Sequence, residues 1–135
     1  MANHYTQLHI QLIFAVKYRE ALIRPEWESD LYKYITGIIQ SREHKMLAIN
    51  GMPDHVHIFI GLNPNESISD LIRETKKAST NFIKENKFTK HRFQWQGGYG
   101  AFSYSHSAID NVVKYIRNQK EHHKKRILKK NTLAF

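Results

Sequence analysis

The stretch Met52-Pro-Asp-His-Val-His-Ile-Phe-Ile60 combines the pattern of a buried strand with two histidines at alternate positions. Side chains of a strand point alternately to its two faces, so His55 and His57 share one face and Val56 lies on the other. The two imidazoles are then about 7 Å apart, a spacing at which both can bind one divalent cation. Alone, the pair is equally compatible with two hydrogen-bonded histidines beside a cleft, and a metal site needs a further ligand.

The segments on either side of this strand reveal their structure through the spacing of apolar residues. Alternating apolar residues predict a long half-buried strand over residues 5–18. Three- and four-residue steps predict a helix over residues 25–43 that begins at a proline. A second strand is expected at residues 46–49. Turn-forming residues at 50–54 make its join to the histidine strand so short that the two strands must form an antiparallel hairpin.

Two capping boxes, Ser67-x-x-Asp70 and Ser107-x-x-Asp110, predict the starts of two further helices. Between these helices, aromatic residues interrupted by glycines predict a fourth strand over residues 93–104 with a bulge or turn inside it. The last helix is expected to run to about Lys125, where a basic tail follows.

The predicted order of elements is β-α-β-β-α-β followed by a helix, which is the split βαβ pattern of ferredoxin-like and RRM-like folds. We therefore expect an α+β fold with an antiparallel sheet, helices on one face, and the other face available for a partner. With 135 residues and no internal repeat or linker, residues 1–135 are expected to form a single domain.

The composition is that of an ordinary soluble protein, with 41% hydrophobic and 24% charged residues. No segment has the length of a membrane span and the N-terminus lacks a signal-peptide pattern, so the expected location is cytoplasmic. The absence of cysteine excludes a disulfide framework, a thiolate zinc site and a cysteine nucleophile. Any metal site would therefore use histidine, carboxylate, amide or water ligands.

The formal net charge of +9, from 21 Lys and Arg against 12 Asp and Glu, favours a polyanionic partner. Nucleic acid is the first hypothesis, with Tyr99 and Phe102 as candidate stacking platforms for bases. For each single basic residue, a solvated surface charge is the alternative. The candidate DNA contacts are Lys17, Arg19, Arg73, Lys76, Lys77, Lys84, Lys124, Lys125 and Arg126.

The last predicted helix has an apolar stripe with two polar side chains on its flank. Tyr115 and Gln119 are four residues apart and form one surface pair. A tyrosine beside an apolar stripe usually packs with its hydroxyl at the rim, and a glutamine one turn later usually faces solvent. The conjunction of this pair with two histidines in a basic chain favours a shared functional site. The stripe consists of Ile109, Val112, Val113 and Ile116.

Three blocks of sequence, in this order, carry a resemblance to a known family. They are Gly51-Met-Pro-Asp-His-Val-His-Ile58, Trp95-Gln-Gly-Gly-Tyr-Gly-Ala-Phe-Ser-Tyr-Ser105, and Val113-Lys-Tyr-Ile-Arg-Asn-Gln119 followed by His122-His123. Over about residues 5–125 the sequence resembles the HUH-type single-tyrosine transposases of small bacterial insertion sequences, the IS200-like transposases.

The resemblance implies an enzyme that cleaves and rejoins single-stranded DNA through a 5′-phosphotyrosine intermediate. By matching motif, Tyr115 is the nucleophile, and His55, His57 and Gln119 hold Mg²⁺ or Mn²⁺. The resemblance also implies a homodimer with composite active sites that binds hairpin ends of its own element. Family members generally continue into an acidic, aromatic-rich stretch, whereas this sequence ends at Phe135. An inactive truncated copy is therefore an alternative.

These residue types suit phosphodiester chemistry. The phosphate oxygens gain charge as an oxygen nucleophile attacks, and a cation held by imidazole, amide and water stabilises that charge. Free tyrosine has a pKa near 10, so it must lose its proton during attack, with help from the metal, a water or a nearby base.

Three other readings of the histidine strand can be compared with this one. A histidine-triad hydrolase would need a third histidine where Phe59 stands, and a cupin site would need a glutamate nearer than Glu66. A non-catalytic single-stranded DNA or RNA-binding module on the same fold would show aromatic residues where His55 and His57 stand. A covalent protein–DNA adduct distinguishes enzyme from binding module. Asp54 is either a hydrogen-bond partner of a histidine or a turn residue.

Overall fold

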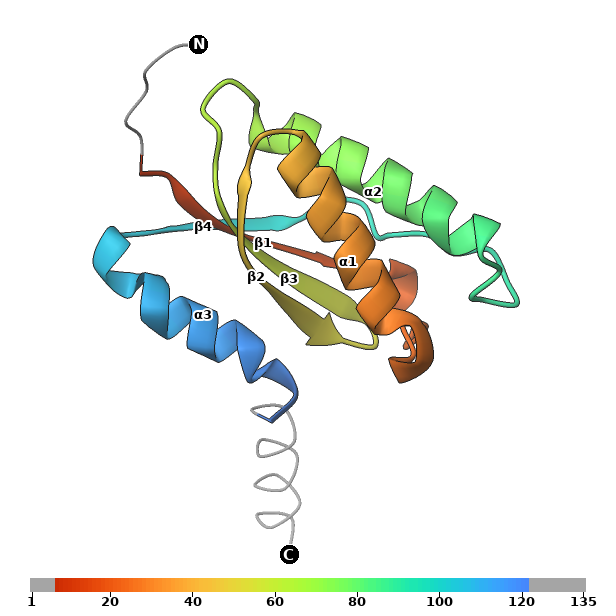
Figure 1. Cartoon of the computed structure of the whole chain (residues 1–135). Coiled ribbons are helices and arrows are strands. Elements are labelled where there is room, and N and C mark those ends of the chain that lie inside the picture. Colours follow the sequence, from red (N-terminus) through yellow and green to blue (C-terminus); the bar gives the residue numbers. More distant parts are fainter. Residues whose placement is uncertain (1–6, 122–135) are drawn as a thin grey trace, which may run out of the picture.

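A computed structural model describes residues 7–121, which form one four-stranded sheet with helices on both of its faces (Figure 1). Two 3-10 helices, Lys17–Arg19 and His106–Ala108, lie in the connections. No helix among these residues is long and apolar enough to cross a membrane. The main elements are β1 (His9–Ala15), α1 (Pro25–Ser41), β2 (Lys45–Met52), β3 (His55–Gly61), α2 (Ile68–Glu85), β4 (Gly100–Tyr104) and α3 (Ile109–Arg117).

The strands are arranged in the order β2-β3-β1-β4, and each neighbouring pair is antiparallel. Helix α1 connects β1 to β2 across the position of β3, and α2 connects β3 to β4 across the position of β1. This is the split βαβ arrangement, so the predicted α+β, ferredoxin-like fold is confirmed. The predicted hairpin is also confirmed, because Met52 pairs with His55 around a turn at Pro53-Asp54.

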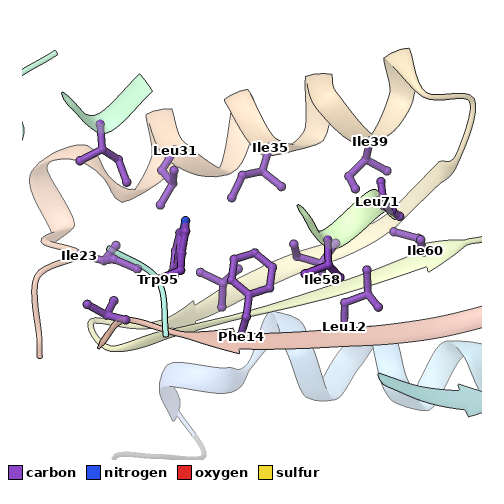
Figure 2. Packing of buried hydrophobic residues seen from close by; sticks show 14 of the residues in the cluster. Leu12, Phe14, Ile23, Leu31, Ile35, Ile39, Ile58, Ile60, Leu71 and Trp95 are labelled. Atoms are coloured by element: carbon purple, nitrogen blue, oxygen red, sulfur yellow. The ribbon is translucent and has the colours of Figure 1, made fainter. Parts of the chain in front are cut away.

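The main core lies between the sheet and the helices α1 and α2. In Figure 2, Leu31, Ile35 and Ile39 point from α1 toward the sheet, where Leu12 and Phe14 of β1 face them. The four-residue spacing on the helix and the two-residue spacing on the strand bring these side chains to one interface. Complete burial of each aliphatic side chain contributes roughly 1.5–3 kcal/mol, which fixes the sheet that carries the histidines.

Helix α3 lies on the opposite face of the sheet, as Figure 1 shows. Its residues Val112 and Ile116 form a second, smaller apolar cluster with Ala48 of β2 and Phe59 of β3. The predicted stripe of this helix therefore packs against the sheet. This face is only partly open to a partner, because α3 covers its β2 and β3 side.

Strand β1 ends earlier than the predicted limit at residue 18. After Ala15 the chain turns into the first 3-10 helix, where Tyr18 and Arg19 have φ angles of 60° and 55°. A backbone in this left-handed region cannot continue a strand. The amide of Val16 donates to the carbonyl of Asp54 at 2.8 Å, which directs the chain toward the histidine turn. The predicted start at residue 5 lies outside the described residues.

The predicted strand over residues 93–104 is mostly a loop. Only Gly100–Tyr104 form β4, and Trp95 makes a single isolated bridge with Val16. The Trp95 side chain is buried, and its indole nitrogen donates to the hydroxyl of Ser79 at 3.0 Å. The aromatic residues at the start of this segment are therefore anchors in the main core, and Gly97 and Gly98 lie in the loop before β4, with a bend at Gly97.

One capping box is confirmed in part and the other is wrong. The Ser67 hydroxyl accepts a hydrogen bond from the Asp70 amide at 3.1 Å and caps α2. Ser107 lies within the second 3-10 helix and its hydroxyl pairs with that of Ser105, so α3 begins at Ile109 without a side-chain cap. Helix α3 ends at Arg117, and residues 119–121 are helical again after a turn. The predicted end near residue 125 lies outside the described residues.

Candidate active site

The two histidines lie at the beginning of β3, on the face of the sheet that carries α3. Val56, Ile58 and Ile60 alternate with them and point into the main core. The two imidazole ring centroids are 5.1 Å apart, with an interplanar angle of 68°. The prediction that His55 and His57 share one face is therefore confirmed.

An acceptor at Nδ1 orients each imidazole. His55 Nδ1 lies 2.7 Å from Oδ1 of Asp54, and His57 Nδ1 lies 2.7 Å from Oε1 of Gln11. Because carboxylate and amide oxygens accept hydrogen bonds, each neutral ring donates its Nδ1–H and keeps a lone pair on Nε2. This assigned tautomer is the one in which Nε2 can bind a cation.

Both acceptors are held in place by further contacts. Arg19 Nε donates to Oδ2 of Asp54 at 3.0 Å. Burial acts to raise the pKa of the Asp54 carboxyl, but hydrogen bonds from His55 and Arg19 outweigh it and lower that pKa below its ordinary value. Gln11 Nε2 donates to the Tyr104 hydroxyl at 2.9 Å. Asp54 thus has both roles that the sequence left open, the turn and the histidine contact.

The environment of His57 keeps its imidazole neutral. The residue is 8% exposed, and burial, followed by the charge of the neighbouring His55, lowers the pKa of His57 to about 4. At pH 7 the ring therefore carries no charge. A neutral imidazole is the form that binds a metal ion.

Tyr115 lies on α3 where this helix passes the histidine strand, and its side chain is 41% exposed. A cavity of about 580 Å³, the tyrosine cavity, is lined by Tyr115 and His57. A neighbouring cavity of about 350 Å³, the histidine cavity, is lined by His55 and His57. The two cavities share His57 and Ile13. The structure thus brings the two histidines and the tyrosine, which are 58 to 60 positions apart in the sequence, to one place.

Gln119 lines neither cavity, although its side chain is buried and its Oε1 atom has no hydrogen-bond partner. Buried amide oxygens are nearly always paired, so this atom has the capacity to bind a hard cation. Within residues 7–121, no group of three or more His, Cys, Asp or Glu side chains is placed to hold a metal. The donors that fit an ion are therefore the Nε2 atoms of His55 and His57, an amide oxygen and water.

The loop before β4 forms one wall of the histidine cavity. Gln96, Gly97 and Gly98 line the cavity, and Gly98 has a φ of +84°, a conformation that favours glycine. Lys76 Nζ on α2 donates to the carbonyls of Gln96 and Gly98 at 2.9 and 2.6 Å, and burial lowers the pKa of this lysine. Lys76 thus uses two of its three donors to hold the loop.

A basic groove follows α2 and the loop after it. Two adjoining cavities of about 420 and 600 Å³ share Thr80, Asn81, Arg92 and Phe93, and together they form the α2 groove. Gly97 lines both this groove and the histidine cavity, so the two adjoin at this residue. None of the described residues that line the groove is Asp or Glu. Its cationic residues are Lys17, Lys76, Lys77, Lys84, Lys87, Lys90 and Arg92.

The predicted DNA contacts are distributed over several surfaces. Arg19 lines the histidine cavity but pairs with Asp54, whereas Arg73 pairs with Asp70 at 2.9 Å and lines neither cavity nor groove. Lys17, Lys76, Lys77 and Lys84 line the α2 groove, and Lys124, Lys125 and Arg126 lie outside the described residues.

The predicted stacking platforms are accessible at the two cavities. Tyr99 lines the histidine cavity and is 43% exposed, and Phe102 lines the tyrosine cavity and is 53% exposed. Their contact with bases stays a prediction.

Comparison with known proteins identifies the family of this chain. The family described as IS200-like transposases matches residues 4–119, a range that contains both histidines, Tyr115 and Gln119. The chain belongs to the IS200-like transposase family.

This IS200-like transposase is similar to the ISDra2 transposase TnpA of Deinococcus radiodurans, with 26% identity over 118 residues and 84% of each chain covered. A crystal structure of a transposase from Deinococcus radiodurans R1 matches with a TM-score of 0.71 and 25% identity, covering 88% of this chain and 95% of that chain. A REP-associated tyrosine transposase bound to a REP hairpin matches with a TM-score of 0.64 and 18% identity, and the match covers 91% of this chain and 74% of that chain. The last likeness shows the fold alone.

Sequence reasoning missed several residues that shape the site of this transposase. Gln11 orients His57, and its only signal was a polar residue on the alternate face of a predicted strand. Asn50 was expected in the turn but lies in β2, where its side chain contacts α3. Lys87 and Lys90 line the α2 groove, and the signal for them was the density of basic residues after α2.

Proposed function

We propose that this transposase cleaves and rejoins single-stranded DNA through a covalent bond between Tyr115 and a 5′-phosphate. The observation that carries the proposal is the tyrosine cavity, in which an exposed tyrosine and a neutral, oriented histidine face the same space. Family membership supports DNA strand transfer as the activity. A tyrosine at such a site is suited to attack a phosphate that spans the two cavities.

In the proposed reaction the Tyr115 oxygen attacks the phosphorus of a phosphodiester. A bond forms between this oxygen and phosphorus, and the bond from phosphorus to the 3′-oxygen breaks. The phenolic proton leaves the tyrosine, and the departing 3′-oxygen takes up a proton to become a hydroxyl. The phosphotyrosine retains the free energy of the phosphodiester, so a second 3′-hydroxyl can reverse the step and join a new strand without ATP.

We propose His55, His57 and Gln119 as the residues that hold a Mg²⁺ or Mn²⁺ ion. Both imidazoles keep Nε2 available, and the amide oxygen of Gln119 is buried without a partner, which supports this donor set. Such an ion, when bound, supplies Lewis-acid stabilisation of charge on the phosphate oxygens. Asp54 and Gln11 would then orient the two ligands, since each accepts the Nδ1–H of one ring.

We further propose that the substrate is a hairpin end of the element and that two copies of the protein hold two DNA ends as a homodimer. A protein of similar fold is bound to a REP hairpin, which supports a hairpin substrate. The α2 groove adjoins the histidine cavity at Gly97 and would hold the phosphates of DNA beyond the reacting position. Sedimentation of the protein with and without DNA tests the dimer.

The decisive experiment is a covalent-adduct assay. The protein is incubated with Mg²⁺ or Mn²⁺ and a labelled single-stranded oligonucleotide carrying the end of the element, then separated under denaturing conditions. We expect a protein–oligonucleotide conjugate from the wild type and none from Tyr115→Phe, which keeps the ring and removes the nucleophilic oxygen. Tyr99→Phe is the control, because it removes a tyrosine hydroxyl at the adjoining histidine cavity and keeps the ring.

Two results would contradict this proposal. If Tyr115→Phe still formed the conjugate, another residue would be the nucleophile. If the wild type bound hairpin ends but never formed a conjugate, the protein would act as a binding module or as an inactive copy.

A further inference from the structure

The C-terminal end of α3 is fixed by a side chain from the sheet. Helix α3 has nine residues, and a helix of this length is marginal in water without tertiary contacts. Its last carbonyls lack partners within the helix. Asn50 Nδ2 donates to two of them, those of Ile116 and Arg117, at 3.0 Å each. These two residues directly follow Tyr115, so the cap acts on the turn that carries it.

Lys120, which follows α3, also attaches the C-terminal end of this helix to the sheet. Its ammonium group donates to Oδ1 of Asn50 at 2.8 Å and to the carbonyl of Gly51 at 3.1 Å, and it lies 3.1 Å from Oε1 of Glu28. An ammonium group has three donors, and these three acceptors match them. Glu28 lies on α1, so Lys120 connects α3 to a helix on the opposite face of the sheet. The Lys120 nitrogen also lies 5.8 Å from the centroid of the Tyr32 ring.

The acceptor side of Asn50 is equally constrained. Its Oδ1 atom accepts from the Gly51 amide at 2.9 Å as well as from Lys120. Gly51 permits this arrangement because a Cβ atom at this position would lie 2.2 Å from the carbonyl oxygen of His55. Hydrogen bonds therefore fix both the amide nitrogen and the amide oxygen of Asn50, and the side chain connects β2 to α3.

Asn50 is also the residue directly opposite His57 in the pairing of β2 with β3. The same side chain that caps α3 is thus fixed to the strand that carries the histidines. Its contacts directly follow the two functional positions, at Ile116 and Arg117 after Tyr115 and at Lys120 after Gln119. Any displacement of this helix end would move both positions relative to His57.

We propose that Asn50, Lys120 and Glu28, the α3 latch, position Tyr115 and Gln119 relative to the two histidines. Asn50 and Lys120 are positioning residues, because they act through the helix. The inference rests on the proposed function for its kinetic consequence, but the attachment of α3 can be measured without DNA. Since a misplacement of about 1 Å can cost about 100-fold in rate, the latch would affect the transfer step more than DNA binding.

The structural arm of the test is hydrogen exchange of the α3 amides in the full chain without DNA. In Asn50→Ala and Lys120→Met we expect the amides of α3 to exchange about tenfold faster, while those of α1 and α2 are unchanged. Lys120→Arg keeps the charge and the donors and should retain most of the protection. Arg117→Met removes one exposed positive charge from the same turn and is the matched control.

The kinetic arm measures the single-turnover rate of adduct formation at saturating oligonucleotide, alongside the dissociation constant. We expect Asn50→Ala and Lys120→Met to lower this rate by roughly 10- to 100-fold with DNA affinity changed less than about twofold, and Lys120→Arg to restore most of the rate. If the amides of α1 and α2 also exchanged faster in Asn50→Ala, that variant would have destabilised the whole fold. The comparison of Lys120→Met with Lys120→Arg would then test the latch.

Unchanged exchange in α3 would overturn the latch, as would equal effects from Arg117→Met or parallel losses of rate and affinity. If the wild type formed no adduct on any DNA, the proposed function would fall and the exchange results alone would decide the latch.

Discussion

The lysines of the α2 groove should contribute a measurable share of the slope of log K against log salt for DNA binding. Lys84, Lys87 and Lys90 line the half of the groove farther from the histidine cavity, where none of the described lining residues is a carboxylate. On single-stranded DNA each neutralised phosphate contributes about 0.7 to the slope of log K against log salt. Replacing all three lysines with glutamine should therefore reduce the slope by about 2. Between about 50 and 200 mM salt, the variant should lose about 20-fold less affinity than the wild type.

The assay is fluorescence anisotropy with a labelled single-stranded oligonucleotide over a series of salt concentrations. Its control replaces Arg24, Lys33 and Lys45 with glutamine, three exposed positions that line no part of the groove. Both variants lower the formal charge of +9 by three, so only the placement of the charges differs. Equal slopes for the two variants would refute the groove as the DNA path and leave only a diffuse effect of net charge.

Three further outcomes follow from the site. His57→Ala should abolish adduct formation and leave hairpin affinity unchanged, and normal cleavage by this variant would exclude His57 as a ligand. The variant should also lose about 1–3 kcal/mol of unfolding free energy, because Gln11 loses its hydrogen-bond partner. Gly51→Ala should lower the melting temperature, since its Cβ would meet the His55 carbonyl. Urea unfolding should show stability falling as the pH drops from about 6.5 toward 4, because the unfolded chain takes up the His57 proton first, and His57→Ala should flatten this slope.

The parts of the fold that the sequence predicts correctly are those whose pattern depends on residues close together in the chain. Alternation in β1 and four-residue spacing in α1 each depend on neighbours along the chain, so both elements were found. Trp95 was placed in a strand because aromatic residues favour strands, but its side chain packs in the main core and bonds to Ser79 on another element. Ser107 matched a capping pattern, yet the backbone forms a 3-10 turn that uses this residue differently.

The site divides in the same way. His55 and His57 could be recognised because they stand in a nine-residue stretch that otherwise has the apolar pattern of a buried strand. Gln11 is 46 positions from His57, and Asn50 is 66 positions from the carbonyl of Ile116 that it caps. Each of these side chains is an ordinary polar residue until the fold supplies its partner. A single sequence contains no information on such pairs, and the long-range contacts of the site were therefore missed.

The different attachments of the two halves of the site determine how each responds to substitution. His57 lies on β3, a central strand whose other face is packed in the main core. Tyr115 lies on a short helix that contacts the sheet through Val112 and Ile116 in a separate, smaller cluster. Local unfolding of α3 would leave the main core intact, so it should cost less free energy than global unfolding. Substitutions beneath α3 should therefore slow strand transfer before they lower the melting temperature, whereas substitution of Ile58 in the main core should reduce both together.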